Sequence, residues 1–219
     1  MILKKFKTSF EFVDNQNYVH SSTILTFIAS VLSSMHENEF YLIKKIKFRS
    51  EVNKNGTLVL ANSFKDLDGI KDIKFDFDIL ANDIALYGYF VEDLSHSIIN
   101  NIQSNYNLKN HKSNNFLGGK SSFEISKFSD SIYADMIQFN KIMHVSSFKD
   151  RHVKKISNVM MQNVPIWTNF DKLDFTEISC KNLFIRESID GIMTLNQINL
   201  KDVSRVFTLE ISFFLHYEK

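Results

Sequence analysis

The chain has 219 residues, of which 44% are hydrophobic and 23% are charged, with a formal net charge of +1. It therefore has the composition of a globular protein without a strongly basic surface for nucleic acid. Its only cysteine, Cys180, excludes an intramolecular disulfide and a cysteine-based zinc site, and it fits a reducing cytoplasm. The N-terminus lacks the pattern of a signal peptide, and no stretch approaches about 18 uncharged apolar residues, so we expect no leader and no membrane span.

The first half of the chain predicts one strand, one helix and then four strands. Residues 6–13 alternate apolar and polar side chains, which is typical of a strand. Ser21, Ser22 or Thr23 is expected to cap a helix that runs to Met35, because the apolar residues behind them recur at spacings of three and four. The four following strands are expected as a meander at 40–52, 56–67, 72–80 and 84–93, with a hairpin turn at Asn55-Gly56.

The middle of the chain reads as a linker between two domains. Residues 96–120 are polar and rich in Asn, and they end in Gly118-Gly119. We expect a short helix near 96–104 within this linker. The predicted domains are therefore 1–95 and 121–219.

The second half repeats the order of elements. It predicts a strand at 121–128 and a helical stretch from 129 that continues, with a break, to Pro165. Strands are expected at 174–188, 191–200 and 205–217, with a turn at Asp190-Gly191. A local match between KFRSEVNKNGTLVL and LFIRESIDGIMTLN indicates a shared strand–turn–strand order in the two halves.

This organisation resembles the hotdog fold, in which a curved antiparallel sheet wraps one long central helix. Its two occurrences resemble the double-hotdog proteins, an α+β class; an unrelated α+β sandwich is the alternative. The resemblance implies acyl-thioester substrates on coenzyme A or an acyl carrier protein, with no bound cofactor. It also implies sites around the helix N-termini where the halves meet, and a monomer or a homodimer as the assembly.

The double-hotdog dehydratases use a His from the first half and an Asp from the second, with a Gln or His one turn beyond the Asp. His20, Asp135 and Gln138 occupy comparable places, and His and Asp suit the proton transfers of dehydration. The glycine and proline that follow the His in that family are absent after His20, which favours the other interpretation, a polar residue at a helix start. The expected substrate-binding residues near the two helix starts are Tyr18, Ser21, Ser22 and Asn140.

Two further functions stay open beside 3-hydroxyacyl dehydration in polyketide or fatty-acid-like biosynthesis. The segment DSIYADMIQFNKIMHVSSF resembles the second half of the leinamycin-type acyltransferase/decarboxylases, which use a tyrosine as acyl acceptor; Tyr18 is the nearest candidate. The third function is a non-catalytic hotdog that binds an acyl carrier protein as a scaffold.

Overall fold

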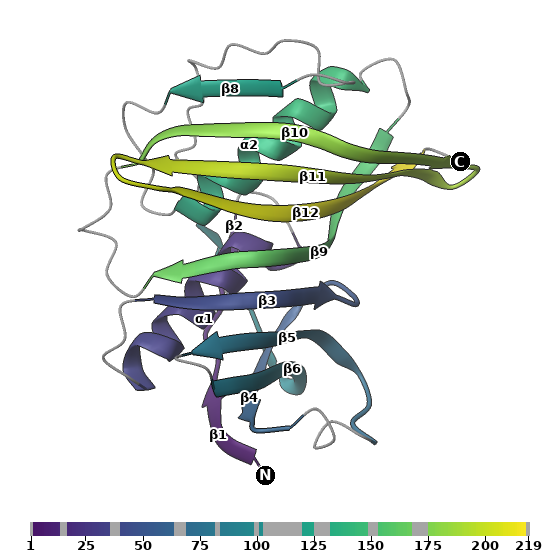
Figure 1. The fold of residues 1–219 in the computed structure, drawn as a ribbon. Helices are drawn as coiled ribbons and strands as arrows, with labels where there is room; N and C mark the ends of the chain where they lie inside the picture. Colours follow the sequence, from purple (N-terminus) through teal and green to yellow (C-terminus); the bar gives the residue numbers. More distant parts are fainter. Residues whose placement is uncertain are drawn as a thin grey trace. The chain divides into compact units, whose positions relative to one another are not determined.

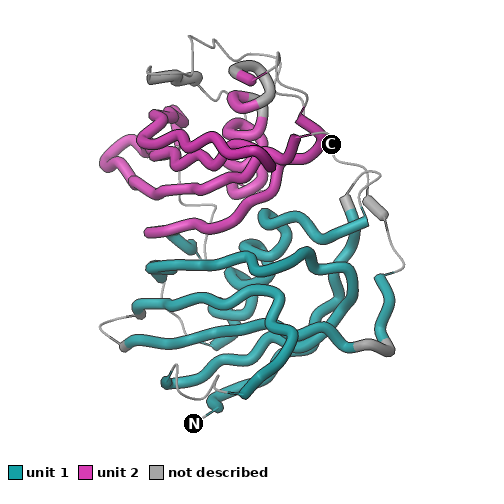
Figure 2. The backbone as a smooth tube through the Cα atoms, turned by 90° about the vertical axis from the view of Figure 1, so that its right-hand side faces the viewer, with its two compact units in different colours: residues 1–105, 164–168 teal, residues 106–163, 169–219 magenta. Residues whose placement is uncertain are grey.

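The computed structural model describes residues 2–13, 17–35, 40–63, 69–81, 84–98, 101–102, 120–124, 132–148, 153–167 and 175–217. The chain divides into two compact units (Figure 2). Unit 1 contains residues 1–105 and 164–168, and unit 2 contains residues 106–163 and 169–219.

The described residues of unit 1 form one helix against an antiparallel sheet (Figure 1). The helix is α1 (Ser21–Met35). The strands lie in the order β1-β4-β6-β5-β3. Their bounds are β1 (Ile2–Lys7), β3 (Phe40–Phe48), β4 (Lys54–Ala61), β5 (Ile73–Ala81) and β6 (Ile84–Ser97). Two short strands, β2 (Phe12–Val13) and β7 (Asn101–Ile102), pair in parallel as a separate sheet.

Helix α1 forms where the apolar period predicted it, and its buried face packs into the core of unit 1. Ile24, Leu25, Ile28 and Leu32 are buried at spacings of three and four, whereas Ser30 on the other side is exposed. The ring of Phe10 lies 5.3 Å from Phe27 of α1 and 5.6 Å from Phe90 of β6. The helix therefore covers the face of the sheet that carries Phe90.

The described residues of unit 2 repeat the same element order. Helix α2 (Ile132–Ser147) follows β8 (Lys120–Glu124). The other strands are β9 (Val153–Trp167), whose residues 153–163 belong to this unit, β10 (Phe175–Ser188), β11 (Gly191–Asp202) and β12 (Val206–Tyr217). The sheet order is β8-β10-β11-β12-β9, and β10 and β11 form the hairpin predicted at Asp190-Gly191.

The helical continuation predicted as far as Pro165 is wrong, because β9 occupies that segment. Val153, Ile156 and Val159 recur at a spacing of three, which imitates a helical period, but all three are β-branched and favour strands. Pairing with β12, from Tyr217↔Val153 to Glu210↔Gln162, selects the extended conformation.

The strand predicted at 6–13 is also shifted. Strand β1 begins at Ile2 and leaves its ladder after Lys7. Two contacts explain the break: the Gly56 N–H donates to Thr8 Oγ1 at 2.8 Å, and Phe10 turns into the core while its N–H donates to Asn55 Oδ1. The alternation of residues 8–11 thus reflects one buried ring and not a continued strand.

The meander predicted for the first half is wrong in its order. Strand β4 pairs with β1 and β6, whereas β3 pairs with β5, so no β3–β4 hairpin forms and Asn55-Gly56 lies inside β4. In unit 2 the strands β10, β11 and β12 are consecutive neighbours. The local sequence match therefore aligned non-neighbours, β3 and β4, with a hairpin, β10 and β11.

The predicted linker falls mostly on residues 103–119, which lie outside the described residues. Strand β6 continues to Ser97 and β7 occupies residues 101–102, so the described part of 96–104 is extended and not helical. The domain division at 95 and 121 stays a prediction.

Candidate functional site

The start of α1 is fixed by backbone bonds to the segment between β3 and β4. The Val19 N–H donates to the Val52 carbonyl at 2.7 Å, and Asn53 Nδ2 donates to the Asn17 carbonyl at 3.0 Å. The His20 carbonyl accepts the first helical bond, from the Ile24 N–H at 3.1 Å. His20 is therefore the N-cap residue, one position before the predicted serines and threonine.

The side chains at this helix start combine an imidazole, a phenol and two hydroxyls. The ring of His20 stacks on Tyr18 with centroids 5.7 Å apart. Ser22 is buried, whereas His20, Tyr18 and Ser21 are half-buried. Burial, and then the negative charge of Glu51, raise the pKa of the Tyr18 phenol, so it stays protonated near neutral pH.

The start of α2 carries the second group of predicted residues. Asp135 lies in the first turn of α2 and is 5% exposed, and Gln138 lies half-buried one turn later on the same side. Asn140 lies five residues after Asp135, which places it about 140° from Asp135 around the helix axis. Asn140 contacts β10 and β11 of its own sheet through Cys180 and Asn196, so the Asp135–Gln138 side is turned away from that sheet.

The face of α2 toward the sheet holds a buried polar network. His144 Nε2 lies 2.6 Å from Thr194 Oγ1, and its Nδ1 lies 2.7 Å from the Asn140 carbonyl. Asn196 Nδ2 donates to Asn140 Oδ1 at 3.2 Å. His144, Asn140, Thr194 and Asn196 are all completely buried. We refer to these four residues as the buried polar network.

The bonds of His144 determine its tautomer and charge. A backbone carbonyl can only accept, so Nδ1 carries the proton and Nε2 accepts from the Thr194 hydroxyl. Burial lowers the pKa of His144 to about 4, although its bond to the Asn140 carbonyl acts in the opposite direction. Burial also raises the pKa of the neighbouring Cys180 thiol to about 12, so both groups are neutral at physiological pH.

Sequence reasoning missed this network, although two local signals mark it. Asn140 and His144 are four residues apart on one helix, and Thr194 and Asn196 are two residues apart on one strand. Each spacing places a pair of polar side chains on one face. Only the packing of α2 on β11 shows that both pairs face inward toward each other.

The predicted catalytic residues are divided between the two units. His20 belongs to unit 1, whereas Asp135 and Gln138 belong to unit 2, and the structure describes each unit by itself. The catalytic pairing of His20 with Asp135, and the substrate-binding roles of Tyr18, Ser21, Ser22 and Asn140, stay predictions. Asn140 already has structural partners in the buried polar network.

Two further searches concern only the described part of the chain. There, no group of three or more His, Cys, Asp or Glu residues is placed to hold a metal ion. Among the same residues, neither helix is both long enough and apolar enough to cross a membrane.

No model of a known protein family matches this sequence, and no curated protein matches it either. Solved structures do match it over nearly the whole chain. The TesB protein of Mycobacterium avium subspecies paratuberculosis has 7% identity and a TM-score of 0.51, covering 98% of this chain and 95% of its own. The chain has a double-hotdog fold.

Two other solved structures are similar in the same way. A conserved protein with a hot dog fold from Alicyclobacillus acidocaldarius has 7% identity and a TM-score of 0.45, covering 98% of this chain and 92% of its own. An acyl-ACP thioesterase from Bacteroides thetaiotaomicron has 8% identity and a TM-score of 0.38, covering 96% of this chain and 97% of its own. In this double hotdog, α1 and α2 are the central helices of the two units.

Proposed function

We propose that this double-hotdog protein hydrolyses acyl thioesters carried on coenzyme A or an acyl carrier protein. The observation that carries the proposal is the place of Asp135: a carboxylate in the first turn of α2, beside Gln138, on the side turned away from its own sheet. The opposite side of α2 is occupied by the buried polar network, so it has no room for substrate.

The chemistry follows from these groups. Asp135 takes a proton from water, and the water oxygen attacks the thioester carbonyl carbon. The C–S bond then breaks and Asp135 returns the proton to the departing sulfur, which releases a carboxylic acid and a thiol. Gln138 is placed to orient the water. The N-terminal end of α2 carries the positive end of the helix dipole, which favours the negative charge that develops on the carbonyl oxygen. Hydrolysis thus needs one carboxylate and one helix N-terminus.

Acyl-CoA substrates of graded chain length test this proposal through release of the free thiol. We expect Asp135→Asn to lower kcat at least about 100-fold, since general-base catalysis contributes about that much. Asp190→Asn, the same chemical change in an exposed turn, is the matched control and should keep full activity. A thermal melt shows whether each variant is folded. Full activity of folded Asp135→Asn would contradict the role of this residue.

Dehydration of a 3-hydroxyacyl thioester is the second candidate, and the place of His20 at the N-cap of α1 favours it. It requires both His20 and Asp135, one for the α-proton and one for the leaving hydroxyl. Formation of an enoyl thioester without thiol release, lost in His20→Asn, would select dehydration over hydrolysis.

The two remaining functions give different results in the same assays. Acyl transfer through Tyr18 predicts that the protein gains the mass of an acyl group after incubation with a methylmalonyl thioester. The raised pKa of Tyr18 counts against this reaction, because a protonated phenol is a weak nucleophile. A carrier-binding scaffold predicts neither thiol release nor an enoyl product.

A further inference from the structure

The face of the unit 1 sheet opposite α1 has an apolar centre of its own. Two rows of side chains cross it, because residues paired across a ladder point to the same side. One row is Lys5, Val59 and Tyr89, and the other is Lys7, Thr57 and Val91. Phe90, which alternates with Tyr89 along β6, points to the α1 side.

The centre of this face is covered by residues just before and at the start of β5. Strands β4 and β5 run parallel with β6 between them. Ile70 and Ile73 pack on Val59 and Tyr89 there. As a result Val59 is only 4% exposed and Tyr89 only 5% exposed. In a unit of one helix layer and one sheet, the sheet face opposite the helix is expected to be solvated.

A hollow of about 470 Å³ lies beside this cover. Its lining comprises the short side chains of Thr57 and Val59 on β4, the lysines of β1 on one side of them, and Tyr89 of β6 and Ile70. The volume is within the range of small-molecule sites, which are mostly apolar with a few polar groups. The hollow therefore has an apolar floor and a cationic edge.

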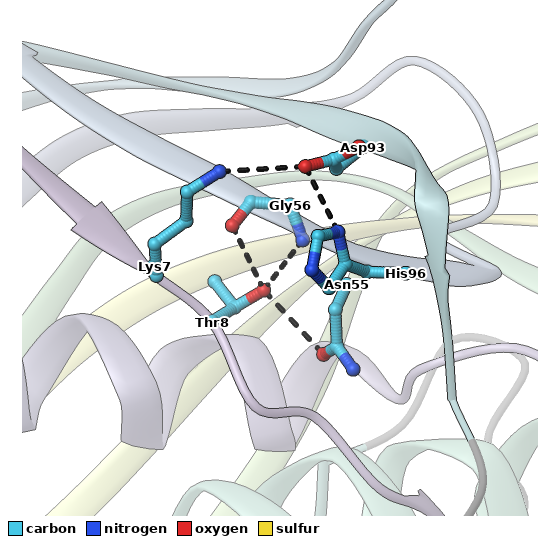
Figure 3. Close-up of polar contacts among 6 residues, drawn as sticks. All are labelled: Lys7, Thr8, Asn55, Gly56, Asp93 and His96. Carbon is cyan, nitrogen blue, oxygen red and sulfur yellow. Dashed lines mark hydrogen bonds and ion pairs between the residues drawn. The ribbon is translucent and has the colours of Figure 1, made fainter.

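The two lysines at the edge differ in their partners. Lys7 Nζ lies 3.4 Å from Asp93 Oδ2, and the same carboxylate oxygen lies 3.0 Å from His96 Nδ1 (Figure 3). Lys5 has no carboxylate partner among the residues that the structure describes. The Lys5 ammonium is thus available to pair with one negative charge of a ligand.

We propose that this hollow, bounded by Lys5, Lys7, Thr57, Val59, Ile70, Tyr89 and Val91, binds a medium-chain fatty carboxylate. The hydrocarbon chain lies on Val59, Tyr89 and Ile70, and the carboxylate pairs with the Lys5 ammonium. A single carboxylate matches Lys5, which has no carboxylate partner in the described part of the chain, whereas a doubly charged phosphate leaves one charge without a partner. The proposal does not depend on the proposed function, because the residues involved belong to unit 1 and Asp135 belongs to unit 2.

Calorimetric titration of the full chain with decanoate tests the site. We expect saturable binding, weaker by about fourfold for each methylene removed down to hexanoate, since each buried methylene contributes that factor. Decanol, which lacks the charge, should bind at least tenfold more weakly. Equal affinity for decanol and decanoate would overturn the pairing with Lys5.

Two variants place the ligand in this hollow, each with a matched control. Lys5→Glu should weaken decanoate binding at least tenfold. Its control, Lys4→Glu, makes the same charge change at the neighbouring exposed position, which points to the other face of β1, and should weaken decanoate binding less than twofold. Thr57→Trp fills the floor and should abolish binding, whereas Thr208→Trp at an exposed strand position of unit 2 should not. Equal effects within either pair would overturn the site. Thiol release by folded Lys5→Glu should stay at the wild-type rate, which separates this test from that of Asp135.

Discussion

At the residue scale, the buried polar network shows how a folded core accepts polar atoms. His144 has a partner on each ring nitrogen, and Asn196 is held in turn by Asn182, which donates to its Oδ1 at 2.8 Å. A buried polar atom without a partner costs about 1–3 kcal/mol, so these bonds are a condition for placing such residues inside unit 2. Asn140 Nδ2 is the exception, since no described residue accepts from it.

His144 should make the stability of the protein depend on pH. Its pKa is about 4 in the folded chain, whereas an unperturbed histidine has a pKa of 6.5, so between these values the unfolded chain binds a proton that the folded chain does not. We expect full stability above about pH 6.5 and a loss that grows to about 3 kcal/mol as the pH falls to 4. Urea unfolding across this range measures the effect.

The comparison for this prediction uses the wild type and one histidine variant. His144→Gln, which has no imidazole to titrate, should flatten the slope between pH 6.5 and 4. A slope that is the same in wild type and folded His144→Gln would show that other groups cause the pH dependence.

At the scale of elements, strand β4 approaches β6 very closely at Gly56. A Cβ at this position would overlap the Val91 carbonyl oxygen and approach Glu92 Cα, which are backbone atoms and cannot rotate away. Thr8 holds the same residue from the other side, through its hydroxyl and its N–H. Glycine at 56 is therefore a packing requirement and not a turn signal.

Gly56→Ala should consequently destabilise the protein by about 2–3 kcal/mol, in the range of overpacked cores. Gly69→Ala is the control: its φ of 87° disfavours alanine, but no atom lies within 4 Å, so the cost should be only about 1 kcal/mol. Chemical denaturation measures both. Equal losses for the two variants would mean that close approach at Gly56 is not the cause.

At the scale of the whole molecule, two units share an element order but differ in strand order. The third strand of unit 1, β4, lies beside the last, β6, whereas its counterpart in unit 2, β10, lies beside the fourth, β11. As a result β6 separates the consecutive strands β4 and β5 of unit 1, whereas the corresponding strands β10 and β11 of unit 2 are direct neighbours. The hollow lies on the unit 1 sheet, where β4 lies between β1 and β6.

The balance of charge over the whole chain also has a consequence. With 26 Lys and Arg residues against 25 Asp and Glu residues, the chain has no excess of positive charge to release counterions from DNA. We expect no saturable binding to a 30-base single-stranded or duplex DNA in fluorescence anisotropy at physiological salt. Binding at micromolar affinity or tighter would contradict this, and a strongly basic protein of similar size serves as the positive control.

The sequence by itself determined the features that depend on neighbours in the chain. The apolar period from Ile24 to Leu32 fixed α1, and the Asp190-Gly191 turn fixed the β10–β11 hairpin, because three or four adjacent residues suffice for each. The repeated strand–helix–strands order was enough to expect two hotdog units. His20 and Asp135 were correctly expected near the starts of the two helices.

Only the tertiary structure decided the features that depend on distant partners. Val153–Trp167 is a strand because β12 offers a ladder, and Asn55-Gly56 lies within β4 because β6 and Thr8 hold it there. The buried polar network needs α2 and β11 together, and the hollow needs β1, β4 and β6 together. Local periodicity carries no information about which strand lies beside which, and that choice is made by the packing of the whole unit.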